Sequence, residues 1–140
     1  MGPDSRLAAT ASEVPTIVFT RSDEQTRSQA LQNKNVTVIQ TDAGSRDLAA
    51  VLDCLAKREI QSILVEGGSQ VAGAFVDAGL VDKFTLIVAP MILGGDQAPV
   101  TIAGRGAATL SDAIRLRDIS VDQFGDDIEI TGYPRKKNEA

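Results

Sequence analysis

The chain contains no histidine and no tryptophan, and its single cysteine is Cys54. Without histidine, neither a Ser-His-Asp nor a Cys-His catalytic arrangement can form, and zinc sites that need histidine are excluded. A lone Cys54 cannot form an intrachain disulfide, so the sequence does not point to an oxidising compartment. Any chemistry must therefore come from a bound cofactor, a carboxylate or backbone dipoles, and no metal site is predicted.

Aromatic residues, positive charge and long apolar runs are also scarce. Aromatics make up 4% of the 140 residues, and 14 Lys and Arg face 19 Asp and Glu, a net charge of -5. This balance argues against a nucleic acid or a membrane as partner. The longest largely apolar run, 84–93, is too short to span a bilayer, and no signal peptide opens the chain. We expect one cytoplasmic domain over residues 1–140, with 1–14 as a lead-in and 135–140 as a flexible tail.

The apolar pattern predicts an α/β fold. Strands are expected at 16–19, 36–39, 62–65 and 84–89, and helices at 23–34, from Ser45 (as N-cap) to Arg58, and at 69–78 with Gly79 as a left-handed cap. Three successive strand–helix–strand units imply a mostly parallel sheet, with its third and fourth strands buried. Residues 114–130 alternate differently, which predicts a C-terminal antiparallel hairpin with a bulge near Asp118.

The turn Glu66-Gly67-Gly68-Ser69-Gln70 joins a predicted strand directly to a predicted helix. Two glycines there allow a ligand to approach the backbone, and the N–H groups of Gly68, Ser69 and Gln70 would face outward at the positive end of the helix dipole. This arrangement suits a phosphate group at the carboxyl end of a strand. Taken alone, two glycines in this position more often form a plain tight turn.

Two other polar groups are candidates. Glu66, directly after an apolar strand, either accepts hydrogen bonds from nearby backbone N–H groups or holds a cationic or hydroxyl-rich part of a substrate. Thr20, Arg21 and Ser22 follow the first strand, and two hydroxyls beside a guanidinium suit an anionic oxygen cluster. An ordinary exposed loop is the simpler interpretation of these three residues.

Three ordered motifs carry a resemblance to a known family. They are Ser62-Ile-Leu-Val-Glu-Gly-Gly-Ser-Gln-Val-Ala-Gly-Ala-Phe75, Ala78-Gly-Leu-Val-Asp82 and Ile87-Val-Ala-Pro-Met-Ile-Leu-Gly-Gly95, followed by Gly104, Ala108-Thr-Leu110 and Asp112-Ala113. From Pro15 onward the chain resembles the reductase domain of the bifunctional riboflavin-synthesis deaminase/reductase. This resemblance implies a dihydrofolate-reductase-like three-layer fold and a homodimer.

The resemblance also implies a reaction and its site residues. The activity would be the NADPH-dependent reduction of 5-amino-6-(5-phosphoribosylamino)uracil, a phosphorylated pyrimidine, to the ribitylamino product. Gly67, Gly68, Ser69, Gln70, Val71 and Ala72 would hold the cofactor pyrophosphate. Thr20, Arg21 and Ser22 would contact the adenosine 2′-phosphate, and Glu66 would orient the substrate.

The chain departs from the family pattern in two ways. The zinc deaminase half is absent, and the family's reductase domain begins before Met1, so the opening strands and the first helix would be missing. We therefore expect a partial domain, N-terminally truncated. Two alternatives stay open: a non-catalytic dinucleotide-binding or assembly fragment, and a dihydrofolate-reductase-like reductase of another substrate.

Overall fold

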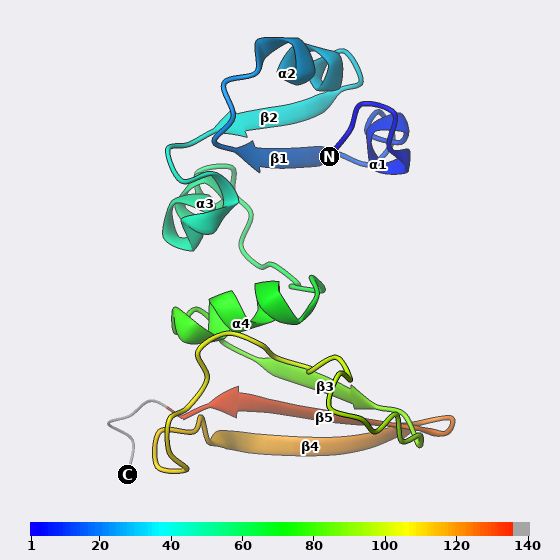
Figure 1. Cartoon of the computed structure of the whole chain (residues 1–140), viewed down its shortest axis with the longest axis vertical. Coiled ribbons are helices and arrows are strands. Elements are labelled where there is room, and N and C mark those ends of the chain that lie inside the picture. Colours follow the sequence, from blue (N-terminus) through cyan, green and yellow to red (C-terminus); the bar gives the residue numbers. More distant parts are fainter. Residues whose placement is uncertain (136–140) are drawn as a thin grey trace. The chain divides into compact units, whose positions relative to one another are not determined.

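The fold is taken from a computed structural model of the chain, which describes residues 1–135. It contains two compact parts, residues 1–63 and the residues from 64 onward, and each is described by itself (Figure 1). The single domain expected over residues 1–140 stays a prediction. No helix within residues 1–135 is long and apolar enough to cross a membrane. The predicted tail lies outside the described residues except for Arg135.

The first part contains a parallel strand pair. Its elements are α1 (Arg6–Ala9), β1 (Thr16–Thr20), α2 (Gln25–Gln32), β2 (Val36–Gln40), the 3-10 turn η1 (Gly44–Arg46) and α3 (Leu48–Ala56). Strands β1 and β2 pair in parallel, from Thr16 opposite Val36 to Thr20 opposite Gln40. The β-branched runs at both positions explain the strands, and the predicted strand–helix–strand unit is confirmed here.

The core of the first part is small and includes the lead-in. Its buried apolar residues are Ala8, Ala11, Leu31 and Val36. Helix α1 is capped by Ser5, whose side chain accepts a hydrogen bond from the N–H of Ala8 at 3.3 Å. The lead-in shows no apolar period in the sequence, because a four-residue helix is too short to produce one.

Helix α3 begins later than predicted. Its N-cap is Asp47, whose side chain accepts from the N–H of Ala50 at 3.0 Å, while Ser45 lies in the preceding 3-10 turn. That turn starts at buried Gly44, which has a φ of +61°. A Cβ at Gly44 would lie 2.9 Å from the nitrogen of Arg21, so this glycine lets the turn close on the end of β1.

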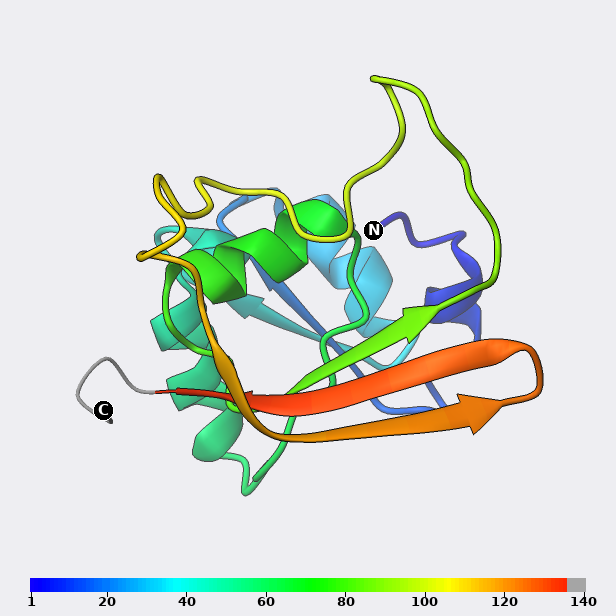
Figure 2. The same cartoon turned by 90° about the horizontal axis from the view of Figure 1, so that it is seen from below.

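The second part combines one helix with an antiparallel sheet. It contains α4 (Ser69–Asp77), β3 (Phe84–Val88), β4 (Leu116–Phe124) and β5 (Asp127–Pro134), with strand order β3-β5-β4 (Figure 2). The predicted hairpin is confirmed. Its register shifts between Arg117 and Ser120, and Asp118 has a φ of +50°, so the predicted bulge is also confirmed. Gly79, at a φ of +67°, follows α4 as expected.

Two predicted strands differ from expectation. Residues 62–65 form no strand, and the Leu64 side chain is 79% exposed. No described strand pairs with this stretch, and an extended backbone without a ladder partner is not a stable strand. Strand β3 forms, but it pairs antiparallel with β5 and is half-exposed, with Ile87 at 69%. The α/β class is confirmed, and among the strands of residues 1–135 only β1 and β2 pair in parallel.

The long segment between β3 and β4 returns alongside α4 (Figure 2). The N–H of Ala103 donates to the carbonyl of Ser69 at 3.0 Å. One turn further along the helix, a Cβ added to Gly73 would overlap the carbonyl oxygen of Ala103. A glycine inside the helix thus allows the two backbones to touch.

Replacing Gly73 with Ala tests this contact. Helix propensity alone favours alanine by about 1 kcal/mol, but the overlap with Ala103 forces the helix or the segment to move, at a cost of about 1–3 kcal/mol. We expect Gly73→Ala to be destabilising in urea unfolding followed by circular dichroism. A stabilised variant would show that the backbones do not touch.

Candidate cofactor-binding site

The start of α4 offers unpaired backbone donors. Gly68 is the N-cap, and its carbonyl accepts from the N–H groups of Val71 at 2.9 Å and Ala72 at 3.2 Å. The N–H groups of Gly68, Ser69 and Gln70 have no acceptor among residues 1–135. No side chain caps this helix. Three donors therefore face outward together with the positive end of the helix dipole.

The two glycines of the turn have different reasons to be glycine. A Cβ on Gly67 would lie 2.8 Å from the Cβ of Val71, so packing within the turn excludes a side chain there. A Cβ on Gly68 would meet nothing within 4 Å, and its φ of -54° suits any residue. Neither packing nor conformation in the described chain requires glycine at position 68. The space that a side chain would fill lies beside the unpaired N–H groups.

Glu66 is exposed, and within the described chain its carboxylate makes no hydrogen bond or ion pair. Its position directly after an apolar run predicts that it lies at the mouth of a buried strand, where a carboxylate needs a partner. That premise was wrong, because residues 62–65 form no strand and are mostly exposed. The interpretation in which neighbouring backbone N–H groups bind the carboxylate has no support in this structure.

Thr20, Arg21 and Ser22 lie in the first part, at the carboxyl ends of β1 and β2. The Thr20 hydroxyl accepts from the N–H of Ser22 at 3.0 Å, and the Ser22 hydroxyl accepts from the N–H of Glu24 at 3.3 Å. Each hydroxyl keeps its own O–H donor. Arg21 is exposed and forms no ion pair with another described residue. These donors suit an anionic group.

The structure therefore divides the predicted site between the two compact parts. Glu66, Gly67, Gly68, Ser69, Gln70, Val71 and Ala72 lie together at the start of α4, in the second part. Thr20, Arg21 and Ser22 lie in the first part. The N–H groups of Val71 and Ala72 are already bonded to Gly68, so these two residues can contribute only through their side chains.

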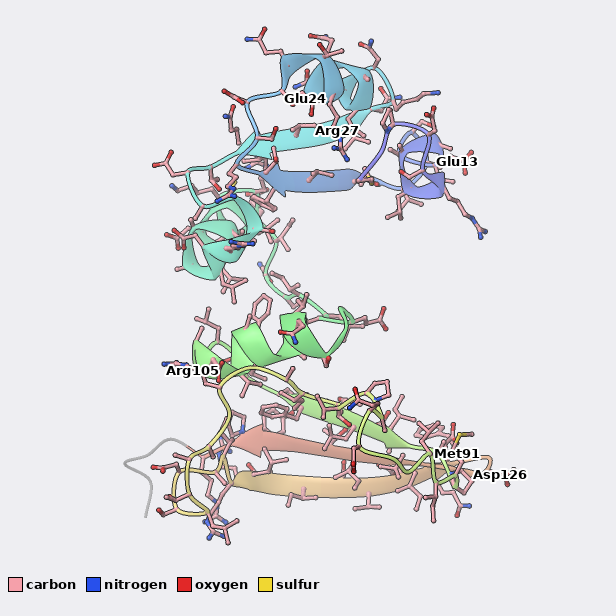
Figure 3. The ribbon with its side chains drawn as sticks, in the orientation of Figure 1. Glu13, Glu24, Arg27, Met91, Arg105 and Asp126 are labelled. Atoms are coloured by element: carbon pink, nitrogen blue, oxygen red, sulfur yellow. The ribbon has the colours of Figure 1, made fainter. Side chains whose placement is uncertain are left out.

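A carboxylate that sequence reasoning missed anchors the other end of α4. Asp77 accepts from the N–H of Arg105 at 2.7 Å and from the N–H of Gly106 at 3.3 Å. It also forms a 3.8 Å ion pair with the side chain of Arg105, which is labelled in Figure 3. A hollow of about 970 Å³ lies beside this anchor, lined by the end of α4, by β3 and by residues 102–116. Gly73, a glycine inside a predicted helix, was the feature of the sequence that could have indicated a close approach of another backbone segment to α4.

Comparison with known proteins supplies the family. A family model described as the RibD C-terminal domain matches residues 2–130. The chain belongs to the RibD C-terminal domain family. This result confirms the resemblance drawn from the motifs between Ser62 and Gly95.

Relatives of the RibD C-terminal domain family match most of the chain. The chain is 32% identical to the riboflavin biosynthesis protein RibD of Bacillus amyloliquefaciens, over 95% of this chain and 36% of that protein. It is 30% identical to the 2,5-diamino-6-ribosylamino-4(3H)-pyrimidinone 5′-phosphate reductase of Methanothermobacter thermautotrophicus, over 83% of this chain and 54% of that one.

Solved structures support the same fold. Acinetobacter baumannii RibD matches with a TM-score of 0.67 at 26% identity, over 76% of this chain and 29% of that one. A pyrimidine reductase-like protein of Corynebacterium diphtheriae matches in fold with a TM-score of 0.70 at 23% identity, over 97% of this chain and 54% of that one. The chain thus spans between about a third and about half the length of these relatives.

Two substitutions test the anchor of α4. Asp77→Ala removes the acceptor of two backbone N–H groups, and we expect a loss of about 1–3 kcal/mol together with faster hydrogen exchange at Arg105 and Gly106. Arg105→Ala removes only an 84% exposed partner and leaves both N–H bonds, so it should cost well under 1 kcal/mol. Equal losses for the two variants would contradict this assignment.

Proposed function

We propose that this chain is the cofactor-binding portion of an NADPH-dependent reductase of riboflavin synthesis. The reaction is the reduction of 5-amino-6-(5-phosphoribosylamino)uracil, a phosphorylated pyrimidine, to the ribitylamino product. Membership in the RibD C-terminal domain family supports the reaction class. The observation that carries the cofactor assignment is the set of unpaired N–H groups at Gly68, Ser69 and Gln70, beside the open space at Gly68.

The start of α4 fits a pyrophosphate on physical grounds. Three N–H donors and the helix dipole favour an anion, and the absence of a Cβ at Gly68 lets phosphate oxygens approach the backbone. Gly67 serves the turn by leaving room for Val71. The side chains of Val71 and Ala72 complete the contact with the cofactor.

Thr20, Arg21 and Ser22 supply the preference for NADPH over NADH. A guanidinium with two hydroxyl donors matches the oxygens of a 2′-phosphate, and charge-assisted bonds to such a group are stronger than neutral ones. Because these side chains are exposed, solvent screens the attraction, and the discrimination is moderate.

Bound NADPH supplies the hydride that reduces the sugar carbon of the opened, imine-like substrate. The chain's own residues position the two reactants and exclude water. Glu66, free of partners in the described chain, orients the amino or ribose part of the substrate and stabilises developing positive charge on nitrogen. We further propose a cytoplasmic location and association of two copies of the chain.

A substitution at Gly68 distinguishes a turn that binds the cofactor from a tight turn that binds no ligand. Gly68→Ala adds a Cβ where nothing lies within 4 Å, so the unliganded melting temperature should change little. Excess NADPH, at about a hundred times its dissociation constant, should stabilise the unchanged chain by about 2.7 kcal/mol. The variant should lose most of that gain in a thermal melt. If NADPH stabilises both proteins equally, the start of α4 is a plain tight turn and does not bind the cofactor.

Arg21 tests the preference for the phosphorylated cofactor. We expect Arg21→Ala to weaken NADPH binding about tenfold and to leave NADH binding unchanged, since only NADPH carries the 2′-phosphate. Isothermal titration with both cofactors measures the difference. Lys34→Ala removes an exposed positive charge from the same part of the chain and should change neither affinity. An equal loss of affinity for NADPH and NADH would contradict a contact between Arg21 and the 2′-phosphate.

A further inference from the structure

The turn between β2 and α3 lies beyond the carboxyl ends of the parallel strand pair. Strands β1 and β2 end side by side, with Thr20 opposite Gln40, and both arrowheads point toward this turn in Figure 1. The N–H of Thr41 donates to the carbonyl of Thr20 at 2.9 Å, which carries the pairing one step past the strands. Ligands of open α/β sheets bind beyond such ends. The turn therefore lies on the same side of the strand pair as Arg21 and Ser22.

This turn folds back onto the backbone of Arg21. The N–H of Gly44 donates to the carbonyl of Thr41 at 3.1 Å, and the Thr41 hydroxyl donates to the carbonyl of Gly44 at 3.1 Å. A Cβ built on Gly44 lies 3.5 Å from the Cβ of Arg21. Arg46 follows two residues later, and two residues of chain span at most about 7 Å. The long side chains of Arg21 and Arg46 can therefore reach one anionic group.

Arg46 has no side-chain partner within residues 1–135. It is exposed, and its guanidinium makes no ion pair or hydrogen bond with another described residue. Four carboxylates are close in sequence to the two arginines, and none of them pairs with either one: Asp23, Glu24, Asp42 and Asp47. Asp47 instead accepts from the N–H of Ala50 as the N-cap of α3. Both guanidinium groups are thus available to a ligand.

The location of Arg46 is electrostatically unfavourable for a cation that has no anion beside it. Arg46 directly precedes Asp47, the N-cap of α3, so it lies at the positive end of that helix dipole. Cations stabilise the carboxyl end of a helix and are repelled by its amino end. Arg46 therefore serves no visible structural purpose, whereas a bound anion would be attracted by the guanidinium and by the helix end together.

We propose that Arg46 is a second specificity-determining residue, which binds the adenosine 2′-phosphate of NADPH together with Arg21. A phosphate monoester carries a charge of about -1.5 to -2 at pH 7, so Arg21 alone leaves much of this charge unneutralised. Two guanidinium groups match it, and the hydroxyls of Thr20 and Ser22 donate to the remaining oxygens. The inference rests on the proposed binding of NADPH and adds to that site a residue from a different element.

The two cofactors distinguish this contact from another way in which arginine binds a nucleotide. A guanidinium can also stack on an aromatic ring such as adenine. Adenine is common to NADPH and NADH, whereas only NADPH carries the 2′-phosphate. An effect of Arg46 that is confined to NADPH therefore identifies the phosphate contact. Because the side chain is exposed, the effect should also shrink as salt screens the charges.

Isothermal titration of variants with NADPH and with NADH, at low and at physiological salt, tests the proposal. We expect Arg46→Ala to weaken NADPH binding about fivefold at low salt and to leave NADH binding unchanged. Arg46→Lys should recover part of the loss, because lysine keeps the charge but not the planar fork of donors. The double variant R21A/R46A should bind the two cofactors with nearly equal affinity. The unliganded melting temperature should not change in Arg46→Ala.

Lys57→Ala is the matched control. Lys57 is an exposed cation at the other end of α3, about 14 Å away along a helix of nine residues, and its removal should change neither affinity. The proposal is overturned if Arg46→Ala leaves NADPH binding unchanged, or if it weakens NADPH and NADH equally. In either case, a loss of NADPH binding in Gly68→Ala and Arg21→Ala would show that the cofactor site itself stands. A chain that binds no NADPH would contradict both the site and the role of Arg46.

Discussion

The N–H groups at the start of α4 are donors that the described chain does not satisfy. A buried or ligand-facing N–H needs an acceptor, and a helix N-terminus without a capping side chain leaves several of them open to solvent or to an anion. Glycine at the N-cap removes the side-chain oxygen that serine or aspartate would supply. Gly68 thus leaves the donors open to a phosphate, where a capping residue would occupy them.

Those donors are useful only if the helix holds them in place. Two contacts attach α4 to the segment that returns from β3: Ala103 bonds to Ser69 near its start, and Asp77 binds the backbone of Arg105 and Gly106 near its end. Gly73 lets that segment lie against the helix between them. A phosphate site on a fixed element needs less reorganisation on binding than one on a mobile loop.

Sequence reasoning found the elements that carry their own local signal. The runs at Thr16 and Val36, the helix ending before Gly79 and the bulge at Asp118 were all predictable from periodicity and turn chemistry. The errors of sequence reasoning concerned residues whose structure depends on another, distant part of the chain. Apolar content identifies residues 62–65 as strand-like, but a strand forms only beside another strand, and none of the described strands pairs with it. Asp77 was missed for the same reason, because the backbone N–H groups that donate to its carboxylate lie 28 and 29 residues away.

The candidate site was predictable to a similar degree. The Gly68 turn followed from the position of two glycines before a helix, whereas the need of Gly67 to leave room for Val71 required coordinates. The pairing of Arg115 with Arg135 also required coordinates, because the two residues are far apart in sequence and are joined by a backbone hydrogen bond.

The most direct test of cofactor binding at the start of α4 is a titration of the ¹⁵N-labelled chain with NADPH, followed by the NMR shifts of the backbone amides. We expect large, saturable shift changes at the amides of Gly68, Ser69 and Gln70, and smaller ones at Val71 and Ala72, whose N–H groups are already bonded. Unchanged shifts at the first three amides, under conditions where the chain is folded, would contradict cofactor binding there.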